Sequence, residues 1–438
     1  TPFAFPGLMA SMMPFAGARF GVWEAPLTLA EMMRSTGYYT RGFHAANPFA
    51  SAHFGYGRGF DRLDEFFEFT PAHHGALPEA AGGEGGGEQA PFAARLARPF
   101  LRACRALGRR LPGGSLLRGA WRPVDELLRH ATDMRVKNAL EETFGSTVRR
   151  WVADCRPGPF FLWAHWMTPH EPYVPPPARQ REAGGPTLSR LRALMLRRAA
   201  GRGKGLTEAQ RRDLVALYDG EVRRFDHELG RLLKVLRARG LLDPSLLIVT
   251  ADHGEALGEH GRCFHPSLHY EELLGVPLIV RLPGQQNQRR SEGEVSLLDL
   301  MPTLADLVGA ELPEDVCMGR SFAPLLRGEE PMAGDRLVES QSAYGEHEEV
   351  HRLRTRDLRR LRRRVSFQNS RLKLMVDPGE DRCRAFDLRA DPREERDLAE
   401  AHPGLAQTGR ALAGIRLREA ERRRVRHTFP DGPPGRRP

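Results

Sequence analysis

Cysteine is scarce in this sequence, and long apolar runs are missing. The 438 residues contain five cysteines, which are scattered, odd in number and never spaced as Cys-x-x-Cys. This excludes a disulfide framework and gives no sign of a zinc site. No apolar run approaches the ~20 residues that a membrane-spanning helix needs. With 40% hydrophobic and 28% charged residues, the composition is that of a globular protein of one to three domains.

Lysine is also rare, although the chain is basic. Only four of the 66 basic residues are lysines, and the net charge is +10. Arginine clusters lie at residues 192–202, 352–364 and 416–426. Because the guanidinium fork matches sulfate and phosphate, a polyanion-binding surface is one interpretation. The other is compositional bias with solvated helix faces, and residues 359–365 can form such a helix with only Leu361 and Val365 as apolar anchors. No motif indicates specific nucleic-acid binding.

Helical and strand patterns alternate along the chain. Thr28, with Glu31 three positions later, has the signature of a capping box at a helix start. Further helices are predicted at residues 136–154 and 209–239, and strands at residues 38–43, 159–164 and 246–249. This alternation predicts an α/β fold with a mostly parallel central sheet sandwiched by helices. Shorter strands at residues 371–376 and 385–388 predict a small antiparallel C-terminal sheet.

The predicted strand at residues 246–249 ends in a group of polar residues. Asp252 and His253 follow it, and His265 lies on the next loop before a second apolar run at residues 276–282. In an open α/β sheet, chemistry gathers at the carboxyl ends of the strands. Carboxylate and imidazole side by side suit a divalent metal.

The string DHGE…GEHG…H…YEEL…VPLIV, within residues 252–280, resembles the sulfatase branch of the alkaline-phosphatase superfamily. The pattern TLAE…GYxT…NP…GFD in residues 28–61 is similar to the same family. The resemblance implies the alkaline-phosphatase-like fold and covers most of residues 1–400. It also implies a metal-assisted hydrolase of sulfuric esters.

The resemblance assigns roles to five residues of this chain, and Asn47 is a sixth candidate because it is the polar group left where the family has a lysine. Asp252 and His253 correspond to metal ligands, with Ca²⁺ expected first and Mn²⁺ or Mg²⁺ as alternatives. His265 and His170 correspond to the catalytic pair that contacts the ester, and two further residues are assigned to substrate binding, His165 and Asn47. The implied substrate is a small-molecule or polysaccharide sulfate ester.

Two features of the family pattern are missing from this chain. The family's first strand carries two adjacent aspartates for the metal, and the sequence begins at Thr1 after that strand. Ala4 stands where the pattern has its Cys or Ser nucleophile, and alanine has no atom that can attack. We therefore expect impaired activity. The alternatives are a phosphoric ester hydrolase or phosphoglycerol transferase of the same superfamily, and a non-catalytic anion-binding protein derived from a sulfatase. What precedes Thr1, and the compartment, stay open.

The expected organisation has three parts. Residues 1–330 form a catalytic domain, with residues 71–134 and 178–205 as insertions or a lid. Residues 331–415 form a small C-terminal subdomain. Residues 416–438 are expected to be a disordered basic tail.

Overall fold

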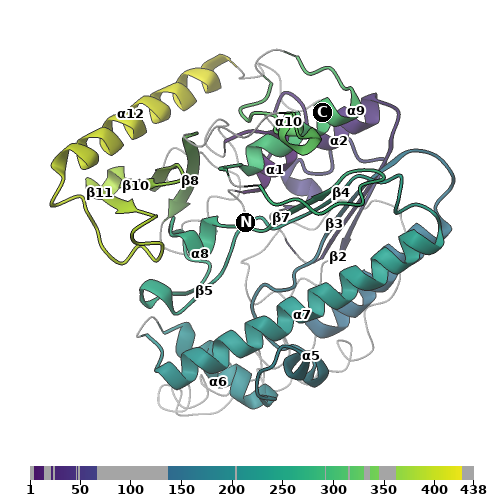
Figure 1. Cartoon of the computed structure of the whole chain (residues 1–438), viewed down its shortest axis with the longest axis horizontal. Coiled ribbons are helices and arrows are strands. Elements are labelled where there is room, and N and C mark those ends of the chain that lie inside the picture. Colours follow the sequence, from purple (N-terminus) through teal and green to yellow (C-terminus); the bar gives the residue numbers. More distant parts are fainter. Residues whose placement is uncertain are drawn as a thin grey trace, which may run out of the picture.

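A parallel sheet lies between two groups of helices (Figure 1). The computed structural model describes residues 4–13, 21–22, 25–45, 47, 50–66, 137–202, 205–291, 293–313, 316–329, 336–344 and 362–426. The sheet has the order β2-β1-β3, and its parallel strands are β1 (Tyr39–Ala45), β2 (Arg62–Phe66) and β3 (Phe160–His165). The expected insertion at residues 71–134 lies outside the described residues.

A second pair of strands carries the polar motif. β4 (Leu247–Thr250) and β7 (Leu278–Arg281) pair antiparallel. Ile248 of β4 packs against the same core cluster as Phe161 of β3, so the end of β4 comes close to the parallel sheet. The site loop between β4 and β7 contains β5 (Ala256–Leu257), the 3₁₀ turn η3 (Glu259–Gly261), β6 (Cys263–Phe264) and α8 (Glu271–Leu274).

Helices cover both faces of the sheet (Figure 1). On one side lie α5 (Pro177–Glu182), α6 (Arg190–Ala200), α7 (Glu208–Ala238) and a helix at residues 137–154. On the other side lie α1 (Phe5–Ala10), α2 (Leu29–Ser35), α9 (Leu300–Val308) and α10 (Ala323–Arg327). Further 3₁₀ turns are η2 (Ala52–Phe54), η4 (Leu297–Asp299) and η6 (Pro378–Glu380). The predicted α/β fold is confirmed.

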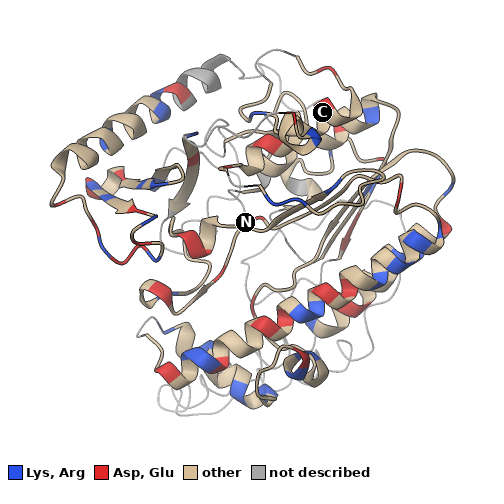
Figure 2. Ribbon diagram, in the orientation of Figure 1, with Lys and Arg blue, Asp and Glu red and all other residues tan. Residues whose placement is uncertain are grey.

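Local signals explain where the helices begin and end. The Glu31 backbone N–H donates to Thr28 Oγ1 at 3.2 Å, and the Thr28 N–H donates to Glu31 Oε2 at 2.9 Å, so the capping box at α2 is confirmed. The long helix α7 ends before Gly240, whose φ of +66° places it in the left-handed region that glycine tolerates. The outer face of α7 carries charges of both signs (Figure 2).

The region expected as a second insertion, residues 178–205, contains two packed helices. α6 buries Ala193, Leu194 and Leu196 in a cluster with Leu214 and Leu217 of α7. Its role as an insertion or lid stays a prediction. None of the helices in the described ranges has both the length and the apolar character of a membrane-spanning segment.

The C-terminal part forms the small antiparallel sheet that the sequence predicts. Its order is β11-β10-β9-β8, and its strands are β8 (Val338–Tyr344), β9 (Arg362–Gln368), β10 (Leu372–Asp377) and β11 (Arg382–Asp387). α12 (Pro403–Arg426) lies against this sheet, and Ala406 and Ala413 share a core cluster with Val365.

Two predictions for this part are wrong. Residues 362–365 belong to strand β9 and not to a helix, because Val365 and Phe367 alternate inward with the period of two that a strand requires. The expected disordered tail is helical at residues 416–426, since α12 continues to Arg426. Residues 351–361 and 427–438 lie outside the described residues.

Candidate active site

The candidate residues gather where the strands of the sheet end. β1 and β3 are in register, so His44 and His165 lie opposite each other at the carboxyl ends of these strands. Asn47 follows β1, and its Nδ2 lies 3.4 Å from His165 Nε2. Asp252 and His253 follow β4 and line a hollow that also contains His265. Asp252 is close enough to His165 to act on its pKa.

Asp252 and His253 present two atoms that suit one metal ion. Asp252 Oδ2 is buried and makes no hydrogen bond within the described residues. His253 Nδ1 donates to the Gly254 carbonyl at 2.8 Å, so its Nε2 keeps the lone pair. His253 Nε2 and Asp252 Oδ2 lie 3.5 Å apart. Two ligands at right angles around one ion lie roughly 3 Å apart, so the pair fits a shared cation.

The protonation states of this pair also fit a metal. Burial lowers the pKa of His253 to about 4, which keeps the imidazole neutral. Burial alone would raise the pKa of Asp252, but the adjacent His253 and other nearby positive groups bring it below its usual range. An ionised carboxylate beside a neutral imidazole is the form that binds a cation.

Gly254 fixes the backbone between the motif and α8. Its N–H donates to the Leu273 carbonyl at 2.8 Å. A Cβ at this position would lie 2.1 Å from the Glu272 carbonyl oxygen. The close approach of the two backbones therefore requires glycine.

His253 also belongs to a group of three histidines, from two loops, whose rings lie close together. The ring centroids of His170 and His265 are 4.5 Å apart, those of His253 and His265 are 4.9 Å apart, and those of His170 and His253 are 6.3 Å apart. Burial lowers the pKa of His170. The structure thus brings together all six residues that the sequence indicates, although their roles stay predictions.

The sequence reasoning gave no role to Glu255, which lies beneath His265. Glu255 Oε1 is 3.3 Å from His265 Nδ1, and Oε2 accepts a hydrogen bond from Tyr173 Oη at 2.6 Å. Burial alone would raise the pKa of Glu255, but His265, His170 and Tyr173 lower it to about 2. Glu255 is therefore a carboxylate held against an imidazole. Its position directly after the Asp-His-Gly motif is the sequence feature that could have indicated a role for Glu255 in the site.

Glu255 also belongs to a second group that could hold a metal. Within the described residues, one ligand atom from each of His170, Glu255 and His265 lies within 4.8 Å of the others. A cation there would compete with the contacts that Glu255 makes to Tyr173 and His265. This group and the Asp252–His253 pair border the same hollow through His265 and His253. Replacing Asp252 and Glu255 separately distinguishes the two possible metal positions.

Lys137 holds the loop that carries His170. Its Nζ donates to the His170 carbonyl, to the Pro172 carbonyl at 3.0 Å and to Glu221 Oε1 at 3.2 Å. Glu221, on α7, also accepts from the Val174 N–H at 2.8 Å. This buried cation and Glu221 thus fix the chain from His170 to Val174.

His269 ties the other catalytic loop to the C-terminal sheet. Its Nδ1 lies 2.9 Å from Ser366 Oγ on β9, and its Nε2 lies 2.8 Å from Ser342 Oγ on β8. Burial lowers its pKa well below the usual value, so the ring is neutral. The segment that follows His265 is therefore anchored to two strands of another sheet.

The hollow contains Ala4 and Gly7 of the N-terminal segment as well as Asp252, His253 and His265. Ala4 directly precedes α1. Among the described residues that line the hollow there is no lysine or arginine. Among the described lining residues, histidine is therefore the one side chain that could carry a positive charge toward an anionic ester.

Comparison with known proteins identifies two matching families. Residues 7–310 match the family described as Sulfatase, and residues 258–413 match the family described as N-sulphoglucosamine sulphohydrolase, C-terminal.

Curated relatives match over part of their length. The chain is 30% identical over 204 residues to an N-acetylglucosamine-6-O-sulfatase of Bacteroides thetaiotaomicron, a match that covers 45% of this chain and 34% of the relative. It is 32% identical over 199 residues to the multifunctional alkaline phosphatase superfamily protein PehA of Trinickia caryophylli, covering 40% of this chain and 38% of the relative. These matches thus span little more than a third of each relative.

Among solved structures, the fold is similar to that of a 2-O GAG sulfatase. The TM-score is 0.62 at 18% identity, and the match covers 99% of this chain and 85% of the other. This likeness over nearly the whole chain concerns the fold alone.

Proposed function

Since this chain belongs to the sulfatase family, we propose that its site is built for the metal-assisted cleavage of sulfate monoesters. The observation that carries the proposal is the hollow itself. Asp252, His253 and His265 line it together, and a buried carboxylate oxygen of Asp252 makes no hydrogen bond within the described residues. The described lining contains no lysine or arginine. A cation bound by Asp252 and His253 would supply the positive charge that the described lining lacks for an anionic ester.

Asp252 and His253 would hold the metal. When bound, the ion neutralises the ester oxygens and supports the charge that develops as the ester bond breaks. Two ligands do not complete the coordination of Ca²⁺, Mn²⁺ or Mg²⁺, so further oxygen ligands are required.

His265 is the proposed acid for the leaving-group oxygen. Glu255 lies 3.3 Å from its Nδ1, so the carboxylate faces that side of the ring and Nε2 points away from it. His170 faces His265 and would contact the ester oxygens. His165 ends β3, Asn47 follows β1, and both would bind the substrate beside these histidines.

Ala4 limits this chemistry. It occupies the edge of the hollow at the start of α1, where the family pattern has its nucleophile, and its methyl group cannot attack sulfur. We therefore expect low turnover from this sequence. The Ala4→Ser variant of the full-length protein should have higher turnover, because a hydroxyl then faces the same hollow.

The test is hydrolysis of 4-nitrophenyl sulfate and 4-nitrophenyl phosphate with and without added Ca²⁺, Mn²⁺ or Mg²⁺. We expect metal-dependent cleavage of the sulfate in Ala4→Ser, lost in Ala4→Ser combined with Asp252→Ala. Cleavage that survives Asp252→Ala, or that needs no metal, contradicts the proposal.

Two other functions have an observation in their favour. The relative PehA is named as a multifunctional alkaline phosphatase superfamily protein, which favours a phosphoric ester hydrolase. Ala4 favours a non-catalytic anion-binding protein. Faster cleavage of the phosphate than of the sulfate would select the first. Metal-dependent binding of sulfate esters, with no cleavage by either the unaltered protein or the Ala4→Ser variant, would select the second.

A further inference from the structure

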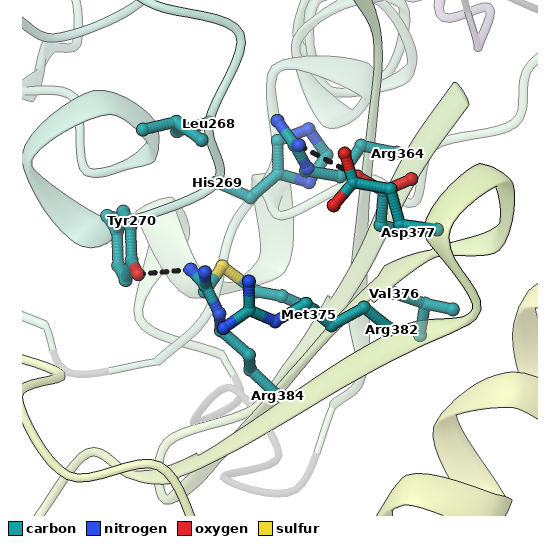
Figure 3. A pocket seen from close by; sticks show the side chains of 10 residues that line it. Leu268, His269, Tyr270, Arg364, Met375, Val376, Asp377, Arg382 and Arg384 are labelled. Atoms are coloured by element: carbon teal, nitrogen blue, oxygen red, sulfur yellow. Dashed lines mark hydrogen bonds and ion pairs between the residues drawn. The ribbon is translucent and has the colours of Figure 1, made fainter. Parts of the chain in front are cut away.

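A second pocket lies where the site loop meets the C-terminal sheet (Figure 3). We call it the arginine pocket, and it is defined by His269, Tyr270, Arg364, Asp377, Arg382 and Arg384. Arg382 and Arg384 alternate on one face of β11, opposite Asp377 and Met375 of β10. Three arginines of two strands thus face one loop.

The arginines differ in what they already bind. Arg364 donates to Asp377 Oδ2 at 2.9 Å and to the Ser267 carbonyl, so its charge is paired. Arg384 donates one N–H to Tyr270 Oη, as Figure 3 shows, and a guanidinium has five. The side chain of Arg382 makes no ion pair or hydrogen bond with any residue in the described ranges. Two adjacent guanidinium groups therefore keep most of their donors available.

The charges of the pocket favour an anion. Arg364 and Asp377 cancel, and Glu380 offsets only one of the two remaining arginines. His269 adds no charge, because burial first and then the nearby Arg364 hold its pKa well below the usual value. Two like charges side by side on one strand repel each other unless an anion lies between them.

The walls of the pocket are held in place. The Tyr270 ring stacks on His260, with centroids 3.6 Å apart and planes 6° apart. His260 in turn contacts Glu272 Oε1 at 3.0 Å. The Arg384 guanidinium lies 5.8 Å from the centroid of the Tyr270 ring. The donors of Arg384 are thus fixed before any ligand arrives, which lowers the entropic cost of binding.

The arginine pocket adjoins the catalytic hollow. Leu268 and His269 line both, and they belong to the segment that starts at His265. Leu268 and His269 therefore lie between the hollow, where the ester is proposed to react, and the guanidinium groups of Arg382 and Arg384.

We propose that the arginine pocket binds a second anionic group of the substrate, a sulfate or carboxylate remote from the ester that is cleaved. The substrate class is then a polyanion that carries at least two such groups. This inference rests on the proposed function for the identity of the first group. The guanidinium fork of Arg382 and Arg384 matches the oxygens of either anion in bidentate geometry.

The experiment measures binding and needs no turnover. Isothermal titration calorimetry compares a heparin-derived disulfated disaccharide, 4-nitrophenyl sulfate and inorganic sulfate, each with the unaltered protein and with the Arg382→Gln, Arg384→Gln and double variants. Arg393→Gln is the matched control, since Arg393 is exposed in the same subdomain and lines neither pocket.

The expected result is a loss of disaccharide affinity of about tenfold or more for each arginine removed, since a hydrogen bond to a charged group contributes about that much. Arg393→Gln and 4-nitrophenyl sulfate should show less than about a twofold change. Arg382→Lys should recover part of the loss.

Other outcomes overturn the inference. Equal losses for the disaccharide and 4-nitrophenyl sulfate would mean that the arginines act on the catalytic hollow. Equal losses for the disaccharide and inorganic sulfate would make the pocket a site for a free anion. If the disaccharide binds through Arg382 but the Ala4→Ser variant cleaves neither the disaccharide nor 4-nitrophenyl sulfate, the pocket stands and the proposed function fails.

Discussion

Glu255 Oε1 lies 3.3 Å from His265 Nδ1, beside the candidate active site. The carboxylate is buried, and its other oxygen is held by Tyr173 Oη at 2.6 Å. A buried carboxylate next to one ring nitrogen fixes the orientation of an imidazole. Glu255 is thus a positioning residue for the proposed acid.

Replacing Glu255 should therefore reduce catalysis without reducing substrate binding. In the Ala4→Ser background we expect Glu255→Gln to lower kcat by about a hundredfold, the size of a general-acid contribution, with KM changed little. Tyr173→Phe keeps the carboxylate and should have a smaller effect. The pH–rate profile is the decisive measurement, because a residue that positions the proposed acid His265 should alter the profile when it is replaced. An unchanged profile would leave Glu255 a purely structural role.

Asp252 should control metal binding. We expect Ca²⁺ or Mn²⁺ to raise the Tm of the unaltered protein, and Asp252→Asn to weaken metal affinity by at least about tenfold, because a charged oxygen ligand is lost. In metal-free buffer Asp252→Asn should unfold at a lower temperature at neutral pH, since the groups that lower the pKa of Asp252 stabilise its charged form in the folded protein.

Glu255→Gln and Asp226→Asn complete the metal experiment. Asp226 is an exposed carboxylate of α7, and its loss should leave affinity unchanged. Affinity that depends on Glu255 and not on Asp252 would move the ion to the group formed by His170, Glu255 and His265.

His269 should make stability depend on pH. Its pKa in the folded protein is well below the ~6.5 of an unfolded histidine. Below about pH 6.5 the unfolded chain therefore binds a proton that the folded protein does not. As the pH falls, the free energy of unfolding should decrease by up to about 1.4 kcal/mol per pH unit from this group.

The His269→Gln variant tests that dependence. At pH 7.5 it should be less stable than the unaltered protein, because the hydrogen bonds to Ser342 and Ser366 are lost or weakened. The difference should shrink between pH 7.5 and pH 5.5, measured by urea unfolding. His227→Gln, at an exposed site on α7, should show no such change. A constant difference for His269→Gln would contradict the assignment.

Lys137 should be among the more costly residues to replace. Lys137→Met removes a cation that Glu221 and two loop carbonyls share, and breaking a buried ion pair costs about 3 kcal/mol or more. Thermal unfolding of Lys137→Met and of Lys234→Met, an exposed control on α7, provides the comparison. A loss below about 1 kcal/mol would show that water replaces the ammonium group.

Much of the candidate site was predictable because its signals are local. The polar residues after β4, the histidines after β3 and the capping box at Thr28 lie at the ends of periodic segments. Parallel strands place such ends at one edge of a sheet, so His165 and Asn47 could be expected together. Asp252 joins them because β4, which pairs antiparallel with β7, shares a core cluster with β3.

The partners of these residues were not predictable. His269 meets Ser366, 97 positions away, and Ser342, 73 positions away. Glu255 was visible in the motif, but its contact with Tyr173 crosses 82 positions. The spacing of residues along a chain predicts which side chains lie on the same face of a helix or strand. It does not predict which distant part of the chain packs against that face.

Strand β9 shows the same limit. Leu361 and Val365, four apart, fit a helix, whereas the structure pairs residues 362–368 with β8 and β10. Ladder hydrogen bonds to two neighbours outweighed a weak local preference. The sequence by itself determined the α/β alternation, the polar strand ends and the arginine-rich charge. Only the tertiary structure decided which of those arginines face one another across the C-terminal sheet, because that depends on strand register and on the loop packed above it.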